Sequence, residues 1–172
     1  MATLVERATA LVRAHPDAEG VALTTQYDDP TETAVVVDGK RIERAISNLL
    51  LNACQSVRAM GISAKVMVIL ETQKHQMIVN VIDNGPGVPE KIRDSLFEPF
   101  VSEGKQKGTG LGLTLAHCIA VEHGGEVILL SSRPGETIFQ MKVTREAAMQ
   151  DQSNAPDDDH HDQVTPDENV RT

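Results

Sequence analysis

The hydrophobic pattern along the chain changes repeatedly between helical and strand-like spacing. Helices are predicted where apolar side chains recur every three or four residues, at 3–14, 39–60, 90–97 and 109–123. Strands are predicted where apolar residues run together or alternate with polar ones, at 20–27, 33–37, 65–72, 75–83, 125–132 and 137–143. Short polar turns join most of these strands as hairpins. This order predicts the α+β class, a two-layer α/β sandwich in which helices cover one face of a mixed, mostly antiparallel sheet.

The helix predicted at 39–60 carries an unusual polar row beside its apolar face, with Asp38 before it as a capping residue. Arg44, Asn48 and Asn52 follow one another at i,i+4 spacing and therefore lie in one line. Asparagine is unfavourable within a helix because its amide competes for backbone partners. An amide oxygen can complete the oxygen shell of Mg²⁺ beside substrate phosphates. The alternative is a pair of asparagines on a solvated face.

The stretch DNGPGV begins at Asp83, at the end of a predicted apolar strand. A carboxylate in this place can accept a hydrogen bond from an exocyclic amine. Gly85 and Gly87 allow backbone conformations and a close ligand approach that a side chain would prevent. Taken by itself, the stretch is also compatible with an ordinary turn.

A second glycine-rich stretch, GTGLGL, opens the helix predicted at 109–123. It lacks the spacing of the Rossmann fingerprint and the closing Gly-Lys-Ser/Thr of a Walker A loop. Backbone amides at a helix start, together with the positive end of the helix dipole, still suit a phosphate. Lys105 and Lys107 lie just upstream and can add positive charge. A flexible turn is the alternative reading, and the stretch FEPF before it (97–100) reads as a rigid apolar hinge or a small core plug.

Composition and charge narrow the possible partners. The 172 residues carry a formal net charge of −9, contain no Trp and include one Tyr, which argues against a nucleic-acid partner. The acidic, apolar-poor C-terminal end is expected to be disordered. We therefore expect a folded domain at 1–146 and a tail at 147–172.

The two cysteines, Cys54 and Cys118, both fall in helical apolar patterns and are expected to be small buried hydrophobes in a reduced setting. No apolar run approaches the ~18 residues of a membrane span, and no signal peptide is recognisable. The expected location of this segment is cytoplasmic, without direct membrane contact, although a longer protein containing it could be membrane-anchored.

Four stretches resemble, in their order along the chain, the N, first glycine, F and second glycine boxes of sensor histidine kinases. They are the asparagine-rich helix, D-x-G-x-G, F-x-P-F and G-x-G-x-G. The resemblance covers about residues 20–145. It is strongest to nitrogen-regulation-like kinases, on the stretches NLLLNACQ, LFEPFVSEGK and EHGG. It implies the ATP-binding catalytic domain of the GHKL superfamily, with the Bergerat fold, and the cofactors ATP and Mg²⁺. The implied partners are a dimerisation and histidine-acceptor domain and the receiver domain of a response regulator.

The resemblance also implies roles for individual residues. Asn52 would coordinate Mg²⁺, with Asn48 beside it, and these two are the expected catalytic residues. Asp83 would accept from the adenine amino group, with Gly85 and Gly87 close to the base and Thr137 supporting the site through water. Residues 101–107 would form the ATP lid. The other implied cofactor contacts are Gln55, Lys105, Lys107, Gly108, Thr109, Gly110, Leu111 and Gly112.

Three features depart from the family pattern. Gln55 stands where many members have Lys or Arg, so the charge of the phosphates must be met elsewhere, and Lys105 and Lys107 are the candidates. The lid is short. None of the six histidines lies in the acceptor motif H-E/D-x-R-x-P, so the acceptor helices are expected to be absent from this chain, which is either a fragment or a partner acting in trans.

Three alternatives share the superfamily. A hydrolysing ATPase of the chaperone or mismatch-repair type places a glutamate one turn before the Mg²⁺ asparagine, where this chain has Asn48. An amide cannot accept the proton of water at neutral pH, which favours transfer over hydrolysis. The others are a serine-kinase anti-sigma factor and a degenerate nucleotide-sensing module, and the complete set of boxes disfavours both.

Overall fold

The computed structural model describes residues 1–28, 37–58, 63–73, 76–101 and 110–144. The helices are α1 (Ala2–Arg13), the 3₁₀ turn η1 (Pro16–Ala18), α2 (Gly39–Arg58), α3 (Glu90–Arg93) and α4 (Gly112–Glu122). The strands are β1 (Ala22–Tyr27), β2 (Lys65–Thr72), β3 (Gln76–Asp83), β4 (Glu126–Arg133) and β5 (Glu136–Thr144).

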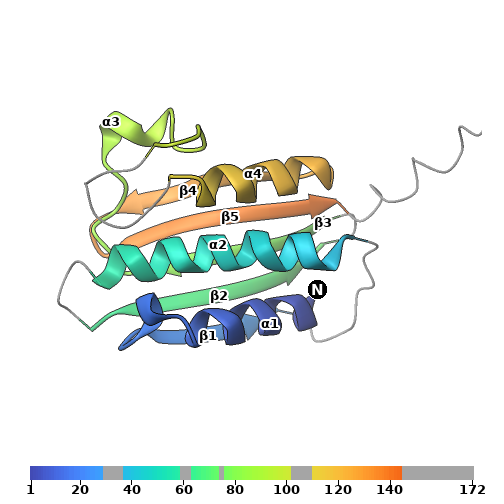
Figure 1. The fold of residues 1–172 in the computed structure, drawn as a ribbon, viewed down its shortest axis with the longest axis horizontal. Helices are drawn as coiled ribbons and strands as arrows, with labels where there is room; N and C mark the ends of the chain where they lie inside the picture. Colours follow the sequence, from blue (N-terminus) through green and yellow to red (C-terminus); the bar gives the residue numbers. More distant parts are fainter. Residues whose placement is uncertain (29–36, 59–62, 74–75, 102–109, 145–172) are drawn as a thin grey trace, which may run out of the picture.

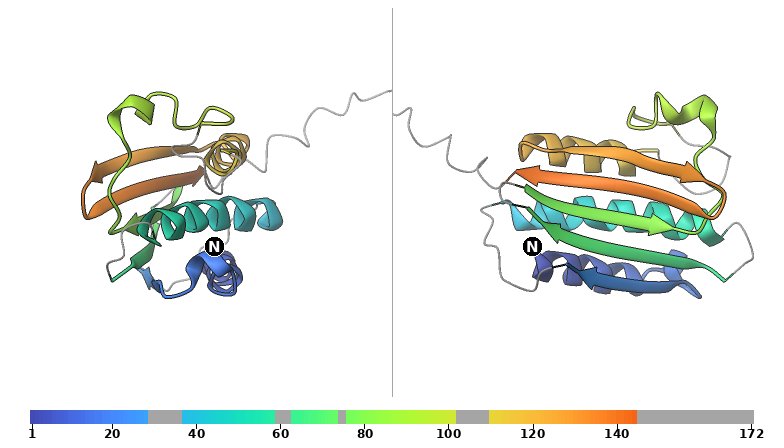
Figure 2. Two further views of the ribbon diagram at one scale, coloured as in Figure 1. Left: turned by 60° about the vertical axis from the view of Figure 1, so that its left-hand side comes forward. Right: turned by 180° about the vertical axis from the view of Figure 1, so that it is seen from behind.

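The five strands form one mixed sheet in the order β1-β2-β3-β5-β4. Strands β1 and β2 are parallel, and every other neighbouring pair is antiparallel. Helices α1, α2 and α4 lie side by side on one face of this sheet, and in the view from behind none of the described helices covers the other face (Figures 1 and 2). The predicted α+β two-layer sandwich is therefore confirmed.

The core forms where the apolar faces of the helices meet alternate strand residues. The predicted apolar face of α2 is completely buried: Ile42, Ala45, Ile46, Leu49, Ala53 and Val57. It packs on the inward-facing side chains of β2 and β3, while α4 covers β4 and β5, where Phe139 is the largest fully buried side chain. Each buried Ile, Leu, Val or Phe side chain contributes about 1.5–3 kcal/mol when it leaves water, so this face fixes α2 on the sheet.

Chain direction brings several predicted motifs to one end of the sandwich. Helices α2 and α4 run in opposite directions, so the C-terminal half of α2 lies beside the start of α4, on the left in Figure 1. Strand β3 also ends there, at Asp83. The asparagine row, the first glycine stretch and the second glycine stretch therefore converge.

Several sequence predictions need correction. Helix α4 begins at Gly112 and not at 109–110, because Gly110 has a left-handed φ of 66° that no helical residue adopts. The helix predicted at 90–97 is limited to α3. Cys54 is buried as predicted, but Cys118 is exposed, because α4 turns Ala116, Ile119 and Ala120 inward and leaves Cys118 on its outer side.

Some predictions fall outside the described residues. Residues 33–36 of the strand expected at 33–37 are among them, whereas Val37 is described and forms a bend. The tail at 147–172 is also outside the described residues. Among the described helices, none has the length and apolar character needed to cross a bilayer.

Candidate functional site

Asp83 is a buried carboxylate at the end of β3, directly opposite Thr137 of β5. It is 2% exposed, and its Oδ1 accepts a hydrogen bond from the Gly85 amide at 2.8 Å. Burial raises the pKa of Asp83 above its ordinary value, while the Gly85 amide and the Thr137 hydroxyl partly offset that rise. An ionised carboxylate has about four lone-pair sites, so Asp83 retains the capacity to accept from a ligand.

Gly85 is required by the close approach of two side chains. A Cβ at this position would lie 2.6 Å from both Asp83 Oδ1 and Ser56 Oγ. Ser56 is a site residue that the sequence predictions missed. It follows Asn52 by four residues on α2, so extending the row of Asn48 and Asn52 by one turn would have found it.

The loop that begins with Gly85 is joined to the β4–β5 hairpin. The Gly135 amide donates to the Gly85 carbonyl at 2.8 Å, and the Val88 amide donates to Ser132 Oγ at 2.7 Å. Gly87 has φ +85°, and a Cβ there would lie 3.2 Å from the Arg133 carbonyl carbon. The loop therefore follows a single path that glycine permits and the hairpin fixes.

Asn48 and Asn52 lie on consecutive turns of α2, between the Asp83 end of β3 and the start of α4. Both side chains are partly buried. The Nδ2 atom of Asn48 is buried and makes no hydrogen bond within the part of the chain that the structure describes. A Cβ added at Gly112 would lie 3.9 Å from the Asn48 Oδ1 atom, so the start of α4 faces Asn48. A buried amide without a partner is costly, and this nitrogen is free to donate to a ligand.

The first turn of α4 is open to an external partner. Leu111 occupies the capping position of this 11-residue helix, and its apolar side chain makes no capping hydrogen bond to the first amides. Just before it, Gly110 packs on the backbone of Phe100, whose amide donates to the Gly110 carbonyl at 3.1 Å. The remaining predicted residues of this stretch, Lys105, Lys107, Gly108 and Thr109, lie outside the described residues.

The phenylalanines of FEPF have different environments. Phe97 packs against the core and stacks on His117 of α4, with 5.0 Å between ring centroids. Phe100 is 75% exposed and has a left-handed φ of 66°. The hinge interpretation fits Phe100, whereas the core-plug interpretation fits Phe97.

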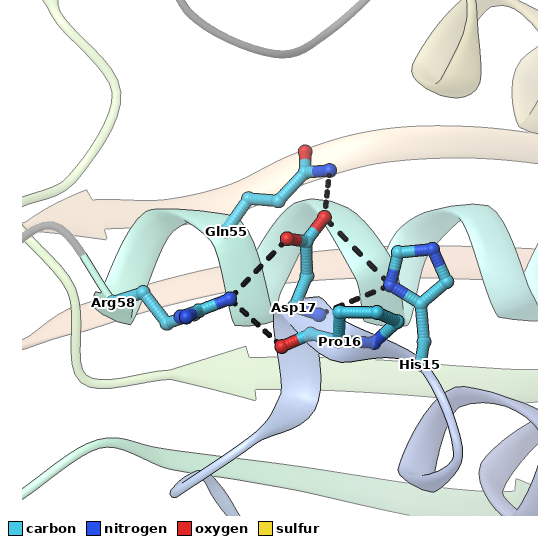
Figure 3. Close-up of polar contacts among 5 residues, drawn as sticks. All are labelled: His15, Pro16, Asp17, Gln55 and Arg58. Atoms are coloured by element: carbon cyan, nitrogen blue, oxygen red, sulfur yellow. Dashed lines mark hydrogen bonds and ion pairs between the residues drawn. The ribbon is translucent and has the colours of Figure 1, made fainter.

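Gln55 is not brought together with the other predicted residues. Its amide donates to Asp17 Oδ2 at 2.8 Å, on the side of α2 covered by η1 (Figure 3). Arg58 joins the same cluster through hydrogen bonds to the Pro16 carbonyl at 2.8 Å and Asp17 Oδ1 at 3.4 Å. In this structure Gln55 ties α2 to η1, and its role as a nucleotide contact stays a prediction.

This geometry agrees with the comparisons to known proteins. Residues 37–147 match the family described as histidine kinase-, DNA gyrase B-, and HSP90-like ATPase. The match covers most of the chain, and the chain belongs to this family. Within the family, its similarity is to sensor histidine kinases, on which both the sequence and the structure comparisons agree.

Two curated relatives illustrate the similarity in sequence. The sensory histidine kinase/phosphatase NtrB of Rhodobacter capsulatus is 35% identical over 126 residues, covering 67% of this chain and 35% of the relative. NtrB of Salmonella typhimurium is 34% identical over 147 residues, covering 80% of this chain and 41% of the relative. The chain thus spans about two fifths of the length of these relatives, and its homology identifies it as a histidine-kinase ATPase domain.

Solved structures agree in fold. The catalytic domain of the histidine kinase ThkA has a TM-score of 0.72 at 25% identity, covering 84% of this chain and 92% of that domain. ThkA in complex with the response regulator protein TrrA has a TM-score of 0.68 at 23% identity, and the match covers 87% of this chain and 41% of the ThkA chain. Full-length ShkA in complex with AMPPNP has a TM-score of 0.69 at 24% identity, and the match covers 82% of this chain and 29% of the ShkA chain.

Proposed function

We propose that this chain is the Mg²⁺-ATP-binding catalytic domain of a sensor histidine kinase and transfers the γ-phosphoryl group to a histidine on acceptor helices outside it. The observation that carries the proposal is the convergence of three features at one end of the sandwich. These are the buried Asp83, the Asn48 and Asn52 pair, and the uncapped start of α4. We assign them, in that order, to the adenine base, to the Mg²⁺ ion and to the phosphates of one bound nucleotide.

Asp83 accounts for base selection. In its ionised form the carboxylate accepts from the N6 amine of adenine, whereas guanine presents a carbonyl oxygen at the same position. A buried acceptor facing another acceptor is penalised, so a site of this kind discriminates strongly. The Thr137 hydroxyl, buried without a well-formed hydrogen bond among the described residues, is available to the base or to a water beside it.

The asparagines and α4 account for the phosphate end. The amide oxygens of Asn52 and Asn48 are ligands of the type that Mg²⁺ accepts beside phosphates. The unpartnered Nδ2 of Asn48 is a donor, so it would fit a phosphate oxygen and not the metal itself. When bound, the metal supplies charge neutralisation. The free amides of the first turn of α4 would hold the phosphate oxygens.

The residues at the phosphate end favour transfer over hydrolysis. Neither Asn48 nor Asn52 can accept a proton from water at neutral pH. The phosphoryl group is therefore expected to transfer to a better nucleophile, such as an imidazole. The domain contributes the positioning of the nucleotide and the neutralisation of phosphate charge.

The expected partners follow from the relatives. ThkA is solved with a response regulator and ShkA with an ATP analogue. By analogy, this chain would bind ATP, would act on the acceptor helices of the same or a partner kinase, and would belong to a protein that signals to a receiver domain. The folded domain is proposed to occupy residues 1–146.

Calorimetric titration with Mg²⁺-ATP tests the site. The wild-type chain should bind, Asp83→Asn should lose at least tenfold in affinity, and Asn52→Ala should bind with little dependence on Mg²⁺. Asp94→Asn, which changes an exposed acid outside the site, is the matched control and should bind normally. Unchanged ATP affinity in Asp83→Asn would refute the assignment.

A further inference from the structure

Arg93, at the end of α3, connects the first glycine loop to the edge strand of the sheet. Its Nε donates to the Val88 carbonyl at 2.9 Å, and its NH2 group donates to the Ser132 carbonyl at 3.3 Å. One planar guanidinium thus holds two backbone segments that are 44 residues apart.

Ser132 of β4 completes the same connection from the other side. Its Oγ accepts from the Val88 amide at 2.7 Å and lies 3.5 Å from the Arg93 NH2 group. It also lies 3.2 Å from the point where a Cβ at Gly87 would stand. Both polar groups of Val88 are therefore held, the amide by Ser132 and the carbonyl by Arg93.

These contacts act on the base-recognition end of the proposed site. The loop from Gly85 to Val88 follows Asp83 directly, and the Gly85 amide holds the Asp83 carboxylate. Arg93 itself lies outside the sandwich core, with 38% of its side chain exposed, and its ion pair with the exposed Glu90 is a long contact of 4.0 Å. Its bonds therefore constrain the loop more than they support the core.

We propose that Arg93 and Ser132 are positioning residues for adenine recognition. Together they fix the loop so that Asp83 faces the exocyclic amine of the base. This inference rests on the proposed function, because it assigns a role within the same nucleotide site. It predicts that loosening the loop weakens the contact to the amine and leaves the phosphate end intact.

Calorimetry with two nucleotides separates these effects. ATP carries the exocyclic amine, whereas inosine triphosphate has a carbonyl oxygen in its place and the same phosphates. Arg93→Ala and Ser132→Ala should each reduce ATP affinity about tenfold, the order expected when a charge-assisted or buried hydrogen bond is lost. Affinity for inosine triphosphate should stay the same, so the preference for ATP falls about tenfold.

Conservative and neighbouring variants provide the controls. Ser132→Thr keeps the hydroxyl and should restore the preference, and Arg93→Lys, which keeps the charge but not the two-point fork, should show an intermediate loss. Arg133→Ala removes an adjacent exposed arginine that pairs with Glu136 at 2.9 Å and should change neither affinity. Circular dichroism verifies that each variant is folded.

Two results would overturn the inference. One is an unchanged preference for ATP in both alanine variants, and the other is an equal loss for both nucleotides, which indicates general loosening. If the wild-type chain bound neither nucleotide, the proposed function itself would fail, and that outcome is distinct from both.

Discussion

At the scale of a residue, the buried Asp83 carboxylate lowers the stability of the fold while it serves the proposed binding site. Burial raises its pKa, so the folded state holds the proton more tightly than the unfolded chain does. Stability is therefore lost as the pH rises from the ordinary pKa of an aspartate through the raised pKa of Asp83. Above that raised pKa the folded protein carries the whole of this cost.

Replacing Asp83 by Asn should remove that cost. The amide oxygen can still accept from the Gly85 amide, but no charge is buried. Without nucleotide, the variant should unfold at the same or a higher temperature than the wild type at pH 7. The difference should shrink as the pH falls from the raised pKa of Asp83 to the ordinary aspartate pKa. Thermal melts at several pH values measure it, and a variant clearly less stable at pH 7 would contradict the account.

Gly85 offers a second test at the residue scale. Its backbone is compatible with alanine, but the new methyl group would overlap Asp83 Oδ1 and Ser56 Oγ. Gly85→Ala should therefore displace the carboxylate and reduce ATP affinity tenfold or more. Adding Ser56→Ala removes one of the two overlapping oxygens and should recover part of that loss, as titration of the single and double variants would show. A double variant no better than Gly85→Ala would exclude this steric explanation.

At the scale of elements, α2 and α4 are joined at the end opposite to the candidate site. Asp38 caps α2, with Oδ1 accepting from the Lys40 and Arg41 amides at 3.1 and 3.2 Å. The Asp38 amide in turn donates to His123 Nε2 at the end of α4, and Arg41 forms an ion pair with Glu122. This connection helps to set the position of α4 along α2. The packing of the two helices against each other continues from there to the start of α4 at Gly112.

Removing the cap tests whether the two ends of the sandwich are separable. Asp38→Ala should reduce the free energy of unfolding by about 1 kcal/mol, the usual value of a lost helix cap. ATP affinity of the folded protein should not change, because the cap is far from Asp83. Denaturant unfolding and calorimetry on the same samples measure both, with Asp94→Ala as the control. A tenfold fall in ATP affinity would show that the distant end controls the site.

The elements also show what local sequence can and cannot predict. The face of α2 and the two hairpins were predictable because their periodicity is local and strong. The start of α4 was misplaced because the left-handed Gly110 depends on the Phe100 backbone. Ser132 and Arg93 were missed because their contacts join segments about 40 residues apart, and no local pattern signals such a contact.

At the scale of the whole molecule, the three histidines in the described residues are all engaged in the fold. His15 contacts Asp17, His117 stacks on Phe97, and His123 bonds to the Ile119 carbonyl at 2.7 Å. None of these three stands at the candidate phosphate end as a free nucleophile. The proposal that the acceptor histidine lies on another domain therefore meets no competing histidine among the described residues.

The transfer reaction itself can be reconstituted in trans. The chain alone, incubated with Mg²⁺ and γ-labelled ATP, should acquire little label. With a separately produced acceptor-helix domain from an NtrB relative, that domain should acquire label that is stable to alkali and lost in acid, as expected of a phosphohistidine. Asn52→Ala should abolish the labelling, while Asp94→Asn should preserve it. Steady release of phosphate without labelled acceptor would instead indicate a hydrolysing ATPase, because water would then be the nucleophile that the asparagine pair is expected to leave inactive.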